Sequence, residues 1–227
     1  MPRVHYLHEL QHIRDELLMM ASMVYQALDS SVQALRTHDI ETAQRIIVAD
    51  MDINRKRFGV ETDILTIIAT QQPMAGDMRM LAGALEIAGE LERIGDYGKG
   101  IARITLMLGR EPLLAMPAHL TLMAQHALSM LRRAIDAYIA QDVDAAKTIP
   151  YTDDALDELY NQVALDLFNA VIADPTKFLH SNYYSWAAHN LERTGDRAVN
   201  ICERTIYTVT GDMNELDYME EGIAGID

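Results

Sequence analysis

The chain has 227 residues, of which 34 are acidic and 19 are lysine or arginine, and its formal net charge is −15. Such a surface repels a phosphate backbone, so binding to nucleic acid is not expected. Hydrophobic residues make up 49% of the chain, and no apolar run approaches the ~18 residues of a membrane span. Cys202 is the single cysteine, and the first residues show no apolar signal segment. We therefore expect a cytoplasmic protein that is not inserted directly in a membrane.

The helical pattern extends over almost the whole chain. Apolar residues recur at spacings of three and four, which predicts an all-α fold. Asp39 and Asp142 are placed to act as N-caps, and residues 113–117, between two prolines, are the best candidate for a linker. The predicted helices cover about 6–36, 40–69, 76–108, 118–140, 143–173 and 178–210.

An internal repeat divides these helices into two groups of three. The motif L-E-R-I-G-D at 91–96 returns as L-E-R-T-G-D at 191–196, and seven of fifteen positions are identical between 91–105 and 191–205. We therefore predict two tandem three-helix bundles, each one copy of a duplicated unit. Their expected limits are residues 1–111 and 117–212, followed by an acidic tail, 213–227, that is expected to fray.

The first predicted hairpin brings polar side chains together. If the second and third helices fold back on each other at Pro73, Asp50 faces Asp96 and Asn54 faces Glu92. Each pair on one helix is four residues apart and so shares a face. The register thus predicts a cluster of four oxygen-bearing side chains in the first bundle.

The second predicted hairpin repeats this arrangement around Pro175. Here Asp153 faces Asp196 and Asp157 faces Glu192. Farther along the last helix, on the same stripe, Glu203 could add a further carboxylate. The second cluster therefore contains more acidic groups than the first.

Grouped carboxylates suggest a metal site. Carboxylates at i and i+4 repel each other, and packing two such pairs together adds desolvation, which a cation relieves. Oxygen ligands suit Mg, Ca, Mn, Fe or Zn, in different geometries. In the first bundle Lys99 and Arg103 could neutralise the acidic groups instead, so the second bundle is the better candidate. The alternative is a solvated helix face with ion pairs to Arg93 and Arg193.

Other features carry less functional information. Gly95 and Gly195 recur inside helices, which suggests close helix–helix approach. His5, His8 and His12 share one helix face and are interpreted as a polar surface stripe rather than a metal site. Cys202 is interpreted as a small buried residue. No nucleophile motif is recognisable, so an enzyme is not predicted.

The repeated motifs resemble those of the PhoU family, accessory proteins of the phosphate-specific transport system. The resemblance rests on Q-Q-P-x-A-x-D-x-R at 71–79, on the paired D-x-x-x-N/D motifs, and on L-E-R-T-G-D-R-A-V-N-I-C-E-R at 191–204. It covers about residues 5–212. The second half departs from the family at its turn, where D-P-T-K occupies 174–177.

The resemblance implies a regulator without enzymatic activity. Members of the family are cytoplasmic, often homodimeric, and bind multinuclear clusters of metals such as Fe, Zn, Mn or Mg through the acidic motifs. They repress the phosphate-starvation response by linking the phosphate ABC transporter, through its ATPase or membrane components, to a sensor histidine kinase. The alternatives are an accessory protein of another phosphate transporter, a carboxylate-bridged metalloenzyme, and a helical scaffold that either binds metal or lacks it.

Overall fold

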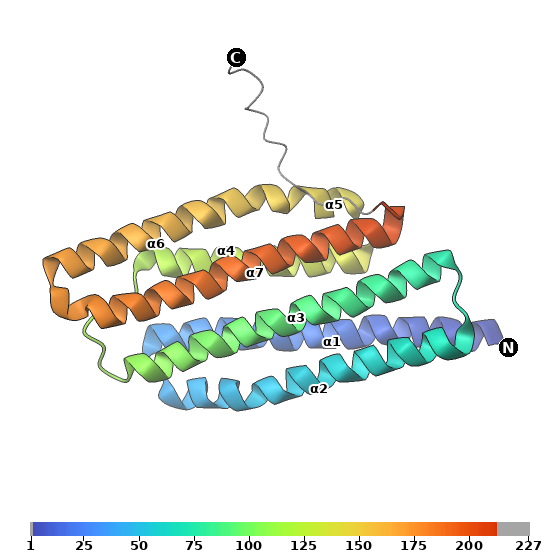
Figure 1. Cartoon of the computed structure of the whole chain (residues 1–227), viewed down its shortest axis with the longest axis horizontal. Helices are drawn as coiled ribbons and strands as arrows, with labels where there is room; N and C mark the ends of the chain where they lie inside the picture. Colours follow the sequence, from blue (N-terminus) through green and yellow to red (C-terminus); the bar gives the residue numbers. More distant parts are fainter. Residues whose placement is uncertain (1, 213–227) are drawn as a thin grey trace, which may run out of the picture.

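The computed structural model describes residues 2–212, with side chains from residue 5 onward, and consists of long helices (Figure 1). No strand occurs in this part of the chain, as the all-α prediction requires, and the predicted tail at 213–227 lies outside it. The elements are α1 (Pro2–Thr37), α2 (Ile40–Gln71), α3 (Ala75–Leu108), α4 (Ala118–Ala140), α5 (Val143–Thr148), η1 (Pro150–Thr152), α6 (Asp153–Ala173), η2 (Pro175–Lys177) and α7 (Phe178–Thr210).

Local capping explains where the long helices begin and end. Asp39 caps α2, because its carboxylate accepts a hydrogen bond of 2.9 Å from the backbone N–H of Thr42. Gly211 ends α7 in a left-handed conformation, with φ of 83°. Asp39 is the cap that the sequence predicts, and the boundaries of α4 and α7 agree with the predicted ranges 118–140 and 178–210 to the residue.

The predicted fifth helix is wrong as a single element. Asp142 does act as an N-cap, since its carboxylate accepts from the backbone N–H of Ala145 at 2.9 Å. The helix that it starts, α5, ends at Thr148, and a 3₁₀ turn that begins at Pro150 separates it from α6. Proline lacks the N–H that would continue the helix, and its ring clashes with the carbonyl four residues earlier. As a result Asp153 lies in the first turn of α6 and not within a longer helix.

The two repeats, α1–α3 and α4–α7, pack against each other around a pair of central helices. Figure 1 shows α3 and α7 side by side and antiparallel, and they contact each other extensively. Polar pairs cross this interface: Arg197 Nη1 lies 3.3 Å from Glu90 Oε2, and Arg204 Nε lies 2.5 Å from Glu86 Oε2. Helix α1 also contacts α4. One cluster of buried apolar side chains runs through both repeats, so the predicted three-helix units share a continuous core.

The linker between the repeats is fastened to the start of α7. The backbone N–H of Leu113 donates to His180 Nδ1 at 2.8 Å, and the hydroxyl of Tyr184 donates to the carbonyl of Leu114 at 3.1 Å. The connection is therefore held at both residues by side chains of the second repeat. Among the described residues, none of the helices combines the length and the apolar character needed to cross a membrane.

Candidate metal centres

In the first repeat a lysine occupies the space between the predicted ligands. Lys99 Nζ lies 2.5 Å from Asp50 Oδ2 and 3.3 Å from Asp96 Oδ1. The Asn54 amide donates a further hydrogen bond of 3.2 Å to Asp50 Oδ2. Asp50 and Asp96 therefore face each other across the α2–α3 hairpin, as the register predicts. The hydrogen bond to Asp50 raises the pKa of Lys99, so the ammonium is firmly held in this position.

A second cation, which the sequence analysis missed, approaches the remaining ligand of this repeat. Arg57 Nη1 lies 3.6 Å from Glu92 Oε2, and Arg57 Nε donates to Glu61 at 2.8 Å. Arg57 follows Asn54 by three residues on α2, so the same hairpin register could have placed it beside Glu92. Lys99 and Arg57 thus place two positive charges beside the three carboxylates of the first repeat, and Arg57 is shared with Glu61.

The second repeat has no such lysine, because Val199 stands at the position equivalent to Lys99. Burial, followed by the charges of Asp157, Asp196 and Glu192 in that order, raises the pKa of Asp153 to about 7. The four predicted carboxylates are therefore near enough to repel one another. The pKa of Asp153 is raised even though this residue lies at a helix N-terminus, where the macrodipole favours an anion.

Glu192 contributes a buried oxygen to this cluster. Its Oε2 atom is buried without a hydrogen-bond partner, and the ring Nδ1 of His189 lies 3.3 Å away, a contact that is an ion pair only when the histidine is protonated. Burial, followed by the charge of Asp196, raises the pKa of Glu192. Arg193 offers only partial compensation, since its Nε is 3.7 Å from Asp196 Oδ2. A cation bound here would relieve both the repulsion and the unsatisfied oxygen.

The cluster is an electrostatic grouping and not a finished coordination sphere. Among the described residues, no three histidine, cysteine, aspartate or glutamate side chains converge closely enough to hold a metal as they stand. The chemistry of the four carboxylates in the second repeat nevertheless fits a metal, because carboxylate oxygens are ligands of hard cations. Glu203 does not belong to the group, because it lies seven residues, or about 10 Å, beyond Asp196 on α7.

Close packing at a glycine brings the two helices of this cluster together. A Cβ atom at Gly195 would lie 2.8 Å from Asp153 Oδ1 and would overlap the side chain of Leu156. In the first repeat, a Cβ at Gly95 would lie 3.2 Å from Ile53 Cδ1. Both glycines therefore mark close helix–helix approach, as the sequence predicts.

The histidines of α1 and the cysteine of α7 lie in environments that suit a surface stripe and a buried core residue, respectively. His5 lies 3.5 Å from Glu9 and His12 lies 3.7 Å from Asp63, in both cases at the exposed surface of α1. Cys202 is fully buried, and burial raises the pKa of its thiol to about 12. The histidines thus form a surface stripe, and the cysteine is a core residue.

Comparisons with known proteins agree with the duplicated architecture. The PhoU domain model matches twice, at residues 17–105 and 120–205. A phosphate-specific transport system accessory protein PhoU homolog of Aquifex aeolicus is 32% identical over 94% of this chain and 96% of its own length. The Escherichia coli accessory protein PhoU is 30% identical over 89% of this chain and 84% of its own.

Solved structures show the same fold. The crystal structure of PhoU from Pseudomonas aeruginosa superposes with a TM-score of 0.85 and 30% identity, covering 91% of this chain and 100% of that one. The phosphate transport system regulatory protein PhoU from Streptococcus pneumoniae gives a TM-score of 0.85 at 27% identity, covering 92% and 99%. Two matched domains, relatives over nearly the full length and a common fold lead to one conclusion: the chain belongs to the PhoU family.

Proposed function

We propose that the protein is a cytoplasmic accessory regulator of a phosphate-specific transport system. The observation that carries this proposal is the match of the PhoU domain to both repeats, together with relatives named as accessory proteins of that system. In this function the protein represses phosphate-starvation genes when phosphate is plentiful. It does so by linking the transporter, through its ATPase or membrane components, to a sensor histidine kinase.

The proposed mode of action is binding and not catalysis. The acidic groups at 50–54, 92–96, 153–157 and 192–196 are ligands or ion-pair partners, and Cys202 is too deeply buried to act as a nucleophile. An anionic helical surface suits recognition of partner proteins, for which complementary charge improves specificity and association rate. The same surface gives no direct attraction to anionic lipid, so placement at the membrane would come from its partners.

A promoter reporter tests the regulatory proposal. A starvation promoter should switch on in a strain that lacks this chain while phosphate remains high, and cross-linking should capture the transporter ATPase or the kinase. A reporter that stays off would contradict the regulatory function. Capture of a different phosphate transporter, without a kinase, would instead support the alternative that the protein is an accessory protein of that transporter.

We further infer that the second repeat holds the metal of this protein. Asp153, Asp157, Glu192 and Asp196 would hold it, and the support is their mutual repulsion together with the unpartnered oxygen of Glu192. A bound Fe, Zn, Mn or Mg ion would supply positive charge that fixes α6 against α7. In the first repeat Lys99 and Arg57 already supply that charge to Asp50, Asp96 and Glu92.

Elemental analysis tests the metal proposal on protein purified without chelators. The double variant E192A/D196A should lose most of the bound metal, whereas the matched variant E92A/D96A in the first repeat should retain it. Equal metal content in wild type and E192A/D196A would contradict the assignment to the second repeat.

We also propose that the chain forms a homodimer. Large apolar side chains are exposed around the α6–α7 turn, namely Phe168, Ile172 and Phe178 at 64%, 65% and 66% exposure. Contiguous exposed apolar surface is typical of protein contacts. Light scattering should give twice the monomer mass for the wild type and the monomer mass for F168E. The control F58E alters an equally exposed phenylalanine on α2 and should leave the mass unchanged.

A further inference from the structure

A cavity lies where the two repeats meet, between α1, α3 and α4. Its volume is about 160 Å³, comparable to the roughly 150 Å³ of an engineered cavity that accepts benzene. It adjoins a second hollow of about 400 Å³ in the groove between α1 and α4, and Leu18, Ile135 and Ile139 line both. The two adjoining hollows, called the groove below, follow α1 from Arg14 to Gln26, twelve residues or about 18 Å.

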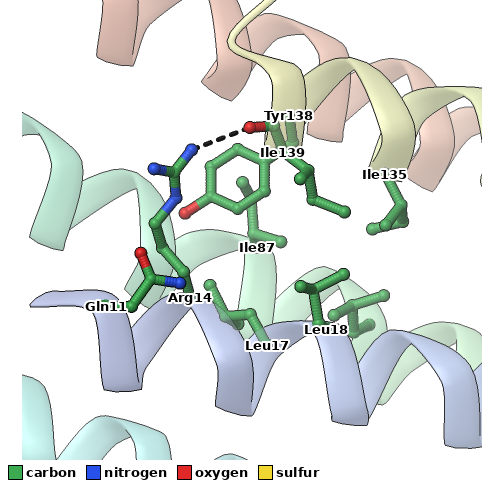
Figure 2. A pocket seen from close by; sticks show the side chains of 9 residues that line it. Gln11, Arg14, Leu17, Leu18, Ile87, Ile135, Tyr138 and Ile139 are labelled. Atoms are coloured by element: carbon green, nitrogen blue, oxygen red, sulfur yellow. Dashed lines mark hydrogen bonds between the residues drawn. The ribbon is translucent and has the colours of Figure 1, made fainter.

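The inner end of this groove has two hydrogen-bond donors. Tyr138 is 6% exposed, and its hydroxyl is buried without a hydrogen-bond partner. Figure 2 shows this hydroxyl beside Arg14, whose charge acts on it, and near Gln11. One guanidinium nitrogen of Arg14 donates to the carbonyl of Ile139 at 2.8 Å, which fixes the side chain and leaves its other N–H groups for a ligand.

These donors select an anionic acceptor. Burial raises the pKa of Tyr138 to about 12, so the hydroxyl keeps its proton and can donate throughout the physiological range. An unsatisfied buried hydroxyl is costly, and a ligand oxygen would satisfy it. The charge of one guanidinium matches one carboxylate, to which arginine can donate two parallel hydrogen bonds.

The remainder of the groove is apolar. Leu17, Ile87 and Leu91 line the inner cavity, and Leu18 and Ile135 continue the apolar wall toward the outer one. Arg132 and Asp136 line the outer hollow with opposite charges, one turn apart on α4. A ligand that fits this groove has a charged head at the inner end and an apolar chain extending toward Tyr25.

We propose that this groove binds a medium-chain monocarboxylate, with the carboxylate on Arg14 and Tyr138 and the hydrocarbon chain between α1 and α4. The site is separate from the acidic clusters, and the proposal does not depend on the regulatory function. Because the ligand contacts both repeats, its binding stabilises their association.

Calorimetric titration of the full chain with octanoate, acetate and octanol tests the chemistry of the ligand. Octanoate should bind in a 1:1 ratio. Acetate, which lacks the hydrocarbon chain, and octanol, which lacks the charge, should each bind at least about ten-fold more weakly than octanoate. Absence of octanoate binding to folded protein would overturn the proposal. Equal binding of octanol would also overturn it, since it would indicate a purely apolar groove.

Three variants test the location. Y138F should weaken octanoate binding about ten-fold without lowering the melting temperature, because the lost hydroxyl has no partner. S22W places a large ring at the outer hollow, which Ser22 lines, and should also weaken binding. The control Y184F removes a hydroxyl that is bonded to Leu114, so it should lower the melting temperature and leave the affinity unchanged. Octanoate binding at wild-type affinity to both Y138F and S22W would place the ligand elsewhere and overturn the proposal.

Discussion

At the residue scale, position 99 and its counterpart 199 distinguish the two acidic clusters most clearly. Lys99 bonds Asp50 and lies close to Asp96, whereas Val199 leaves the second cluster without an equivalent cation. The sequence was sufficient to place Asp50 opposite Asp96 in the first hairpin, because helix periodicity and the turn position determine the register. Arg57 beside Glu92 was missed, although the same register could have placed it there.

Asp153 should make the stability of the metal-free protein depend on pH. Its pKa is about 7 in the folded state against an ordinary value of 3.8, so the folded state binds the proton more tightly than the unfolded state. The free energy of unfolding should therefore fall as the pH rises from about 4 to 7. With chelator present, D153N should be more stable than wild type at pH 8 by roughly 1 kcal/mol, after allowance for solvent screening.

Urea unfolding of D153N and wild type at several pH values measures this effect. The advantage of D153N should disappear toward pH 4, where wild-type Asp153 is protonated as well. The neighbouring exposed residue provides the control, and D154N should have a smaller effect. A D153N advantage of the same size at pH 4 and pH 8 would show that charge is not its cause.

Gly195 should tolerate no side chain. In G195A the new Cβ would press on Asp153 Oδ1 and Leu156, forcing α6 away from α7, which should cost about 1–3 kcal/mol. Gly59 is the matched control, because it lies inside α2 and a Cβ atom there would meet nothing within 4 Å. G59A should stabilise the protein by about 0.5–1 kcal/mol through helix propensity. Chemical denaturation of both variants checks the pair, and a loss in both would indicate a nonspecific effect.

At the scale of elements, breakers and caps allowed most helix boundaries to be predicted. Asp39, Gly109 and Gly211 all mark ends that the structure contains. The break at Pro150 was missed because the apolar periodicity continues on both sides of it, and the prediction followed the periodicity and not the proline. This break affects the acidic cluster of the second repeat, since it places Asp153 at the start of α6.

The cap of α5 gives a prediction at this scale. D142A removes the acceptor for the backbone N–H of Ala145 and should lower the stability by about 1 kcal/mol. D144A alters an exposed residue of the same short helix and should cost only a few tenths of that amount. Thermal unfolding followed by circular dichroism compares the two, and equal losses would show that charge and not the cap hydrogen bond is responsible.

At the scale of the whole molecule, the duplication was visible in the sequence but the packing of its two copies was not. The repeated L-E-R-x-G-D motif predicted two similar units, and the family matches confirm them. Helices α3 and α7 pack together over one continuous core. This packing depends on the complementary shapes of the two repeats, and the sequence of a single repeat does not reveal it. Each acidic cluster thus has two of its residues on one of the adjoining central helices α3 and α7. The first cluster contains Lys99, and the second has Val199 at the equivalent position.

Replacing Lys99 by the valine of the second repeat should convert the first cluster into a metal site. Asp50 is only 5% exposed, so K99V leaves its charge buried without the ammonium, and the metal-free variant should lose about 3 kcal/mol of stability. Divalent metal should restore that stability and raise the bound metal above the wild-type content. K56V is the control. Lys56 forms an ion pair of 2.6 Å with Glu16, which does not belong to the cluster, so the stability lost in K56V should not be restored by metal. Folded K99V with wild-type metal content would show that charge neutralisation by Lys99 is not what distinguishes the repeats.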